Sequence, residues 1–310
     1  MPVRPAPGLC VTVYSGGGLV SGTAESRAIL VALAPQIVML HGDTSVLREC
    51  AAMVRADVPG VRLWAGVGID ALATSATTGR MTPDAVVEEF VRRAQNALAA
   101  GCELVVWDAE EQWKTGANAH DPHGILPSLA RRALLAVAAR VPIAQAFTSY
   151  GVVTEHSTFP WEAFVGEGSP VVVHLPQQYA VMPDPHQRAE VADVIARAQW
   201  SDRSLAAFVA SGRIRADLGP GGAGFGRYLM AYRCATDGLV TVARAAPAAP
   251  YVAFWAAPSL PHGRMDSEGY AAILALLRGT PAQSASAMPA VVAGGIVGAV
   301  ALALWRLFAR

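Results

Sequence analysis

The chain has 310 residues, of which 53% are hydrophobic and 15% are charged, and its 24 Lys and Arg residues are balanced by 24 Asp and Glu residues. Because the net charge is zero and no basic cluster with interleaved aromatic residues appears, nucleic acid is not an expected partner. The four cysteines stand far apart and lack the spacings of zinc sites, so we expect buried apolar thiols rather than a metal site or a disulfide framework.

Short runs of β-branched and aromatic residues alternate with alanine-rich stretches along the chain, which is typical of βα units. The predicted strands are residues 11–14, 37–41, 61–67, 104–107, 143–147, 171–175, 228–232 and 251–255. The predicted helices are residues 23–34, 45–56, 83–100, 126–139, 187–212, 235–246 and 267–277, with a short or irregular helix near 161–165. Eight strands separated by helices, most of them nearly continuous apolar runs, predict one (β/α)8 TIM barrel over residues 1–278.

The main alternative is an open doubly wound sheet, which usually has five or six strands and a glycine fingerprint after the first strand. Here the first strand is followed by Ser15, Gly16, Gly17 and Gly18, without a G-x-G-x-x-G motif and a downstream acid. We therefore favour the barrel, and we expect no dinucleotide, no other cofactor and no metal.

The last part of the chain has the features of a membrane anchor. Residues 279–286 are small and polar and predict a linker. The segment that follows, 287–310, begins with residues 287–305, which carry no charge and are long enough as a helix to cross a bilayer. Trp305 and the arginines after it predict a cytoplasmic C-terminus, with the barrel on the outer side, in a cell envelope or a virion. A buried terminal helix is the alternative.

Two glycines in this segment predict a further contact. Gly294 and Gly298 form a G-x-x-x-G pair on one helix face, which permits the close approach of a second helix. The sequence therefore predicts a membrane as a partner, through residues 287–305, and allows self-association of the anchor.

In a (β/α)8 barrel, active sites lie at the C-terminal ends of the strands. Many of the residues at these positions are aromatic or carry amide or carboxyl groups, which stack on sugar rings and bind hydroxyl groups. We expect the residues that contact substrate to be Asp70, Trp107, Tyr150, His174, Gln177, Tyr179, Tyr232 and Trp255.

The densest group of acids follows the fourth predicted strand. In the D-x-E sequence there, Asp108 and Glu110 fall on the same side of an extended chain. Two carboxylates this close raise one pKa, which leaves one protonated acid for a glycosidic oxygen while the other stays ionised. The structural alternative is that these acids cap the next helix or pair with an arginine.

The sequence VVWDAEEQW at residues 105–113 resembles the fourth-strand D-x-E of barrel glycoside hydrolases, notably the lysozyme-like family 25, the chitinase-like family 18 and bacteriophage lysins. The resemblance implies that Glu110 is the general acid and Asp108 its partner. Residues 174–179 resemble the polar, tyrosine-bearing sixth strand of related barrels, and Trp255 is similar to the tryptophan that floors the sugar site. This sequence lacks the first-strand aspartate of the lysozyme-like family, and Val106 replaces an upstream aspartate of the chitinase-like family.

Other polar residues have weaker patterns. His41 and His174 each fall in or at the end of a predicted strand, where they could act as ligands or acid/base groups, although a histidine bonded to a neighbour is the commoner case. His120, Asp121 and His123 resemble a metal cluster only superficially, and the loop composition favours a turn.

Two functions are compatible with these patterns. The first is a membrane-tethered glycoside hydrolase that acts on a cell-wall or surface polysaccharide such as peptidoglycan. The second is a catalytically silent barrel that binds carbohydrate or serves as a structural component of a virion or cell envelope. The missing family carboxylates favour the second function, and the D-x-E placement with aromatic strand ends favours the first.

Overall fold

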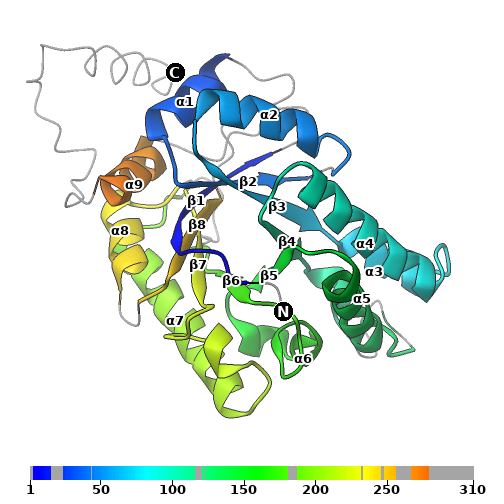
Figure 1. Cartoon of the computed structure of the whole chain (residues 1–310). Coiled ribbons are helices and arrows are strands. Elements are labelled where there is room, and N and C mark those ends of the chain that lie inside the picture. The colour runs from blue at the N-terminus through cyan, green and yellow to red at the C-terminus, as the bar shows by residue number, and fades with distance from the viewer. Residues whose placement is uncertain are drawn as a thin grey trace, which may run out of the picture.

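The computed structural model of the chain describes residues 3–14, 24–42, 44–115, 121, 123–180, 187–231, 233–245, 248–255 and 267–278. Within these residues, eight parallel strands close into a barrel in which each strand pairs with the next and the last pairs with the first. Figure 1 shows the helices as a ring around the strands. The predicted (β/α)8 fold is confirmed.

Each strand is followed by at least one helix of the outer ring. The strands are β1 (Gly8–Tyr14), β2 (Ile37–His41), β3 (Arg62–Gly68), β4 (Leu104–Asp108), β5 (Ala144–Tyr150), β6 (Val173–Gln177), β7 (Gly226–Met230) and β8 (Tyr251–Trp255). The α-helices are α1 (Ala24–Leu33), α2 (Leu47–Asp57), α3 (Asp70–Thr77), α4 (Pro83–Ala99), α5 (Leu126–Arg140), α6 (Trp161–Val165), α7 (Val191–Ala210), α8 (Thr236–Arg244) and α9 (Ser267–Leu277). The described residues also contain three short 3-10 helices, η1 (Glu111–Trp113), η2 (Val153–His156) and η3 (Ala216–Leu218).

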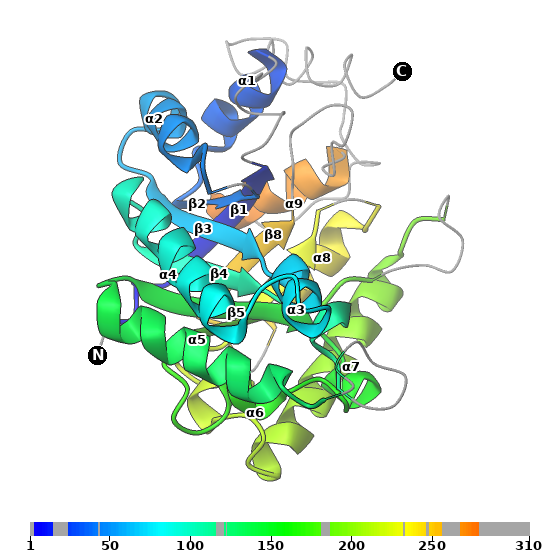
Figure 2. The ribbon, with the colours of Figure 1, turned by 90° about the vertical axis from the view of Figure 1, so that its right-hand side faces the viewer.

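The structure shifts several strand ends and adds one helix to the prediction. β5 and β6 continue beyond their apolar runs to Tyr150 and Gln177, and β7 lies two residues earlier than predicted. Polar residues at strand ends hide the end of a strand from a pattern based on apolar residues. The sequence does not predict α3, because this helix has only eight residues and the residue before it, Ile69, has no capping side chain. Figure 2 shows α3 beside the arrowhead end of β3.

Side chains alternate between the inside of the barrel and the helices. On β4, Leu104 and Val106 belong to the inner cluster, whereas Val105 and Trp107 pack toward the helices. The next inward position is Asp108, at the C-terminal end of the strand. The inner cluster consists of Cys10, Ile37, Met39, Trp64, Leu104, Val106, Ala144, Ala146, Val173, Leu175, Tyr228, Tyr251 and Ala253.

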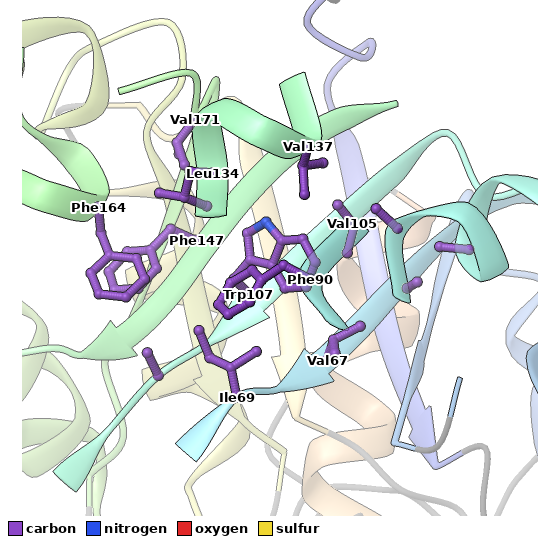
Figure 3. Packing of buried hydrophobic residues seen from close by; sticks show 14 of the residues in the cluster. Val67, Ile69, Phe90, Val105, Trp107, Leu134, Val137, Phe147, Phe164 and Val171 are labelled. Carbon is purple, nitrogen blue, oxygen red and sulfur yellow. The ribbon is translucent and has the colours of Figure 1, made fainter. Parts of the chain in front are cut away.

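The outward side chains of the strands form a larger core beneath the helices. The ring centroids of Trp107 on β4 and Phe90 on α4 lie 4.8 Å apart, and Phe147 on β5 stacks on Phe164 of α6 at 4.6 Å. Figure 3 shows both pairs between strands and helices. Burying a side chain such as Phe contributes roughly 1.5–3 kcal/mol, so this layer fixes the helices and the loops of the mouth against the barrel. All four cysteines are buried, as the sequence predicts.

The C-terminal anchor is not tested by the fold. The predicted linker at 279–286 and the anchor at 287–310, with Gly294 and Gly298, lie outside the described residues. No helix in the part of the chain that the structure describes is both long enough and apolar enough to cross a membrane. Membrane anchoring therefore stays a prediction from the sequence.

Candidate active site

Three carboxyl groups come together at the C-terminal end of the strands. Asp108 is the last residue of β4, Glu110 follows two residues later, and Asp70 begins α3 just after β3. The amide nitrogen of Gln177, at the end of β6, donates to Asp108 Oδ1 at 3.1 Å and to Glu110 Oε1 at 2.9 Å. Asp70 Oδ1 accepts a hydrogen bond from the backbone N–H of Glu110 at 2.8 Å. The two carboxylates of the D-x-E sequence therefore lie on one side of the chain, as predicted.

Burial and neighbouring charges raise the pKa of two of these groups. Burial raises the pKa of Glu110 most, and the negative charge of Asp108 raises it further. The hydrogen bond from Gln177 opposes both effects, because it stabilises the ionised form of Glu110. Burial also raises the pKa of Asp70, although the backbone N–H of Glu110 lowers it. A raised pKa keeps Glu110 protonated to a higher pH than an exposed glutamate, as a general acid requires.

His41, at the end of β2, contacts Asp108 past the intervening strand β3. The Nε2 atom of His41 lies 3.1 Å from Asp108 Oδ2, and each side chain is 13% exposed. The interpretation of His41 as a histidine bonded to a neighbouring side chain is confirmed. Asp108 is therefore held from two sides, by His41 through one carboxylate oxygen and by Gln177 through the other.

Aromatic side chains form an arc from the chain after β6, across β7, to the end of β8. The ring centroids of Tyr179 and Tyr228 lie 5.8 Å apart, and those of Tyr228 and Trp255 lie 6.0 Å apart. His41 continues the arc, with its ring 5.3 Å from that of Trp255. The hydroxyl groups of Tyr228 and Thr12 form a hydrogen bond of 2.8 Å inside the barrel. We call Tyr179, Tyr228 and Trp255 the aromatic arc, and two of its members are predicted substrate-binding residues.

Tyr150, at the end of β5, belongs to a second cluster at the barrel mouth. Its hydroxyl donates to Glu111 Oε2 at 3.1 Å, and its ring stacks on His156 at 3.5 Å. Lys114 Nζ lies 5.0 Å from the centroid of the Tyr150 ring and pairs with Glu111. Burial and Glu111 hold the pKa of the Tyr150 hydroxyl above its usual value. Because His156 covers one face of the ring, that face is closed to a sugar.

The structure corrects the predictions for Trp107 and His174, which do not reach the barrel mouth. Both side chains are fully buried on the helix side of their strands. Trp107 Nε1 donates to Gln145 Oε1 at 3.0 Å. The ring of His174 stacks on Phe147 at 5.7 Å, and its Nδ1 lies 3.2 Å from the backbone oxygen of Leu218. Each residue stands an odd number of positions before the inward-facing residue that ends its strand, so the alternation of side chains turns it outward.

The loop after β4 contains a helix cap. Asp121 accepts hydrogen bonds from the backbone N–H groups of Ile125 at 2.9 Å and Leu126 at 2.8 Å, and so it caps the start of α5. His120 and the predicted substrate-binding residue Tyr232 lie outside the described residues. Among the residues that are described, no three His, Cys, Asp or Glu side chains are grouped so that they could hold a metal ion.

The sequence did not predict two features of the site, which are the position of Tyr228 and the role of Gln177. β7 ends at Met230, two residues before its predicted end, and this register places Tyr228 in the arc. Gln177 is predicted to bind substrate, whereas its amide bridges the two carboxylates. The available signal is the spacing from Leu175, an inward residue of the same strand, which gives Gln177 the same direction as Asp108.

A search of protein-family models and a search of curated proteins find no match to this sequence. Solved structures do match. Active domain 2 of the thermostable chitinase from Pyrococcus furiosus, solved with chito-oligosaccharides, aligns with a TM-score of 0.55 and 13% identity over 89% of this chain and 96% of the chitinase chain. A GH5-4 broad specificity endoglucanase from Clostridium longisporum aligns with a TM-score of 0.56 and 8% identity over 87% and 96% of the two chains. Both similarities support the barrel fold.

Proposed function

We propose that this barrel is a glycoside hydrolase in which Glu110 is the general acid and Asp108 its charged partner. One observation carries the proposal: a single amide, that of Gln177, binds both carboxyl groups at the C-terminal end of the strands. Burial and Asp108 raise the pKa of Glu110, which suits this residue to donate a proton at a higher pH than an exposed glutamate can.

In the proposed reaction, the carboxyl proton of Glu110 moves to the glycosidic oxygen as the bond between that oxygen and the anomeric carbon breaks. Positive charge develops on the sugar ring, and the carboxylate of Asp108 stabilises it. Water supplies the hydroxyl group that ends on the anomeric carbon, and its remaining proton returns to the carboxylate of Glu110. Tyr179 and Trp255 of the aromatic arc are partly exposed and provide rings on which sugars can stack, whereas Tyr228 is buried behind them.

The proposed substrate is a cell-wall or surface polysaccharide of the peptidoglycan type. Two barrels of similar fold are a chitinase solved with chito-oligosaccharides and an endoglucanase, which supports a polymeric sugar as the substrate class. The uncharged segment at 287–305 supports a location next to a membrane. The enzyme would then cleave polymer close to the surface on which it is anchored.

The alternative is a barrel that binds carbohydrate without cleaving it, as a structural component of a virion or cell envelope. Val106 favours this alternative. It occupies the inward position two residues before Asp108, and an apolar side chain there supplies no further carboxylate. The aromatic arc would serve such a binding protein equally well.

The variant Glu110→Gln distinguishes the hydrolase from the barrel that only binds carbohydrate. For a hydrolase, this variant should lower the hydrolysis of peptidoglycan and chitin-like polymers by about 10²- to 10⁴-fold, because the proton donor is removed. The melting temperature should stay nearly unchanged, since an amide oxygen can still accept the hydrogen bond from Gln177. Release of reducing sugar ends and thermal unfolding are the measurements.

Glu88→Gln is the matched control, because Glu88 is an exposed residue of α4 that pairs with Arg140 on the outside of the barrel. This control should hydrolyse polymer at the wild-type rate. Full activity in Glu110→Gln would contradict the proposed role of Glu110. Glycan binding by the wild type without any product, and unchanged in Glu110→Gln, would instead support the silent barrel.

A further inference from the structure

The contact between His41 and Asp108 spans a strand. β2 and β4 do not pair with each other, because β3 lies between them, and the strand register aligns His41 with Gly66 and Asp108 with Gly68. Both glycines are on the inward side of β3, in alternation with Trp64 of the inner cluster. A side chain at position 66 would occupy the space of the imidazole, whereas position 68 has open space around it.

The space left at Gly66 is filled by His41. A Cβ atom built on Gly66 would lie 2.6 Å from His41 Cδ2, whereas one built on Gly68 would meet no atom within 4 Å. On the other side of the imidazole lies the ring of Trp255, with 5.3 Å between the two ring centroids and an interplanar angle of 74°. The imidazole is therefore fixed between the backbone of β3 and a member of the aromatic arc.

The position of His41 bears on Glu110 through a chain of hydrogen bonds. His41 Nε2 contacts Asp108 Oδ2, and this contact orients the carboxylate so that Oδ1 meets the amide of Gln177. The second hydrogen of the same amide reaches Glu110 Oε1 at 2.9 Å. A largely buried carboxylate needs a hydrogen-bonding partner for each oxygen, and His41 is that partner for Oδ2.

We propose that His41 is a positioning residue of the candidate active site, which holds Asp108 in the orientation that lets Gln177 bind Asp108 and Glu110 together. This inference rests on the proposed function for its catalytic consequence, whereas the positioning itself is independent of the reaction. His41 does not touch the reacting atoms in this scheme. It acts through Asp108, and the glycine at position 66 is the structural condition for it.

A comparison of His41→Leu with His41→Gln tests the catalytic consequence. Leucine removes the hydrogen bond, and kcat should fall by about 10- to 100-fold with KM changed less than about twofold, because orientation rather than substrate contact is lost. Glutamine places an amide nitrogen near the position of Nε2 and should recover most of kcat. An unchanged kcat in a folded His41→Leu protein, or a Gln variant as slow as the Leu variant, would overturn the proposal.

Gly66→Ala keeps His41 itself and covers the case in which His41→Leu fails to fold. The added methyl group should displace the imidazole and lower kcat with little change in KM, whereas wild-type kcat in Gly66→Ala would count against the proposal. Gly68→Ala is the control for Gly66→Ala, because it adds the same methyl group to the same strand at a position where no atom lies within 4 Å.

A readout independent of hydrolysis is the ¹⁵N NMR signal of His41 Nε2 in histidine-labelled full-length protein. The signal should shift in Asp108→Asn and in Gly66→Ala, and it should stay in place in Gly68→Ala. If the wild type cleaves no polysaccharide, the proposed function fails while this experiment still decides the positioning. A signal that is unchanged in both Asp108→Asn and Gly66→Ala would overturn the positioning itself.

Discussion

The side-chain amide of Gln177 joins the carboxyl groups of Asp108 and Glu110 by hydrogen bonds. Gln177 lies 67 residues beyond Glu110 in the chain, yet both hydrogens of its amide are used by the carboxylates of the D-x-E sequence. The hydrogen bond lowers the pKa of Glu110, whereas burial and Asp108 raise it, and the net direction is upward. Burial is the largest of these effects on the pKa of Glu110, and the negative charge of Asp108 is the second.

Burial shifts the pKa of His174 downward, in the opposite direction to that of Glu110. Burial lowers its pKa from 6.5 to about 4, because the folded protein disfavours an imidazolium ion beneath the helices. Below pH 6.5 the unfolded chain takes up a proton that the folded chain does not bind. The contribution of His174 to stability is therefore fully present at neutral pH and is lost progressively as the pH falls from 6.5 toward 4.

We predict that His174→Asn lowers the stability at pH 7, because the smaller side chain leaves a cavity, and that the gap to wild type narrows by about 2 kcal/mol at pH 5. Asparagine keeps an N–H donor near the position of Nδ1, for the backbone oxygen of Leu218. Urea unfolding of both proteins at the two pH values measures the gap. A gap that is the same at both pH values would contradict the account of His174 as a buried neutral base.

Alternation along the strands decides which polar residues reach the mouth. Gln177 ends β6 facing inward, whereas Gln178, the next residue, joins a buried network outside the barrel. The guanidinium of Arg227 on β7 donates to Gln178 Oε1 at 2.9 Å and pairs with Asp202 of α7 at 2.9 Å. Through this network, Asp202 of α7 binds both Arg227 of β7 and Gln178, the residue after β6.

Asp202→Asn should destabilise this junction strongly. The change removes the counter-charge of a guanidinium that is 1% exposed, and loss of one partner of a buried ion pair costs about 3–5 kcal/mol. The free energy of unfolding in urea is the measurement, with Glu88→Gln as the comparison, since the Glu88–Arg140 pair is exposed and screened by water. Equal stability of the two variants would show that the buried network contributes no more than a surface pair.

On the scale of the whole molecule, α9 belongs to the barrel. Ala272 and Ile273 of α9 are fully buried. A Cβ atom on Gly269 would lie 2.1 Å from the backbone oxygen of Ala231, so the start of α9 sits directly on the chain that follows β7. The barrel is therefore closed by strand pairing between β8 and β1 and covered by a helix that ends at Leu277.

A chain that ends at residue 286 should thus fold as well as the full chain and remain in solution, because it keeps all eight strands and α9. The full chain should sediment with membranes when residues 287–310 are present. A chain that ends at residue 255 lacks α9 and should unfold at lower temperature. Circular dichroism on heating and membrane sedimentation are the measurements, and unfolding of the 286-residue chain would show that the terminal segment is part of the core.

The sequence by itself determined the number of strands, the (β/α)8 architecture and the place of Asp108 and Glu110 at the C-terminal end of β4. These features depend on runs of apolar residues and on local spacing, which any strand covered on both faces must show. The same reasoning places Tyr179 and Trp255 near strand ends. Local patterns are sufficient to locate the strands, because the apolar residues of each strand show that it is buried.

Only the tertiary structure decided which of these side chains meet. Trp107 and His174 face the helices because strand register, set by pairing with neighbouring strands, fixes the phase of the alternation. Gln177 reaches Asp108 because barrel closure brings β4 and β6 within the span of one amide. His41 reaches Asp108 because Gly66 of the intervening strand β3 leaves room for the imidazole, a condition that has meaning only once the strands lie side by side.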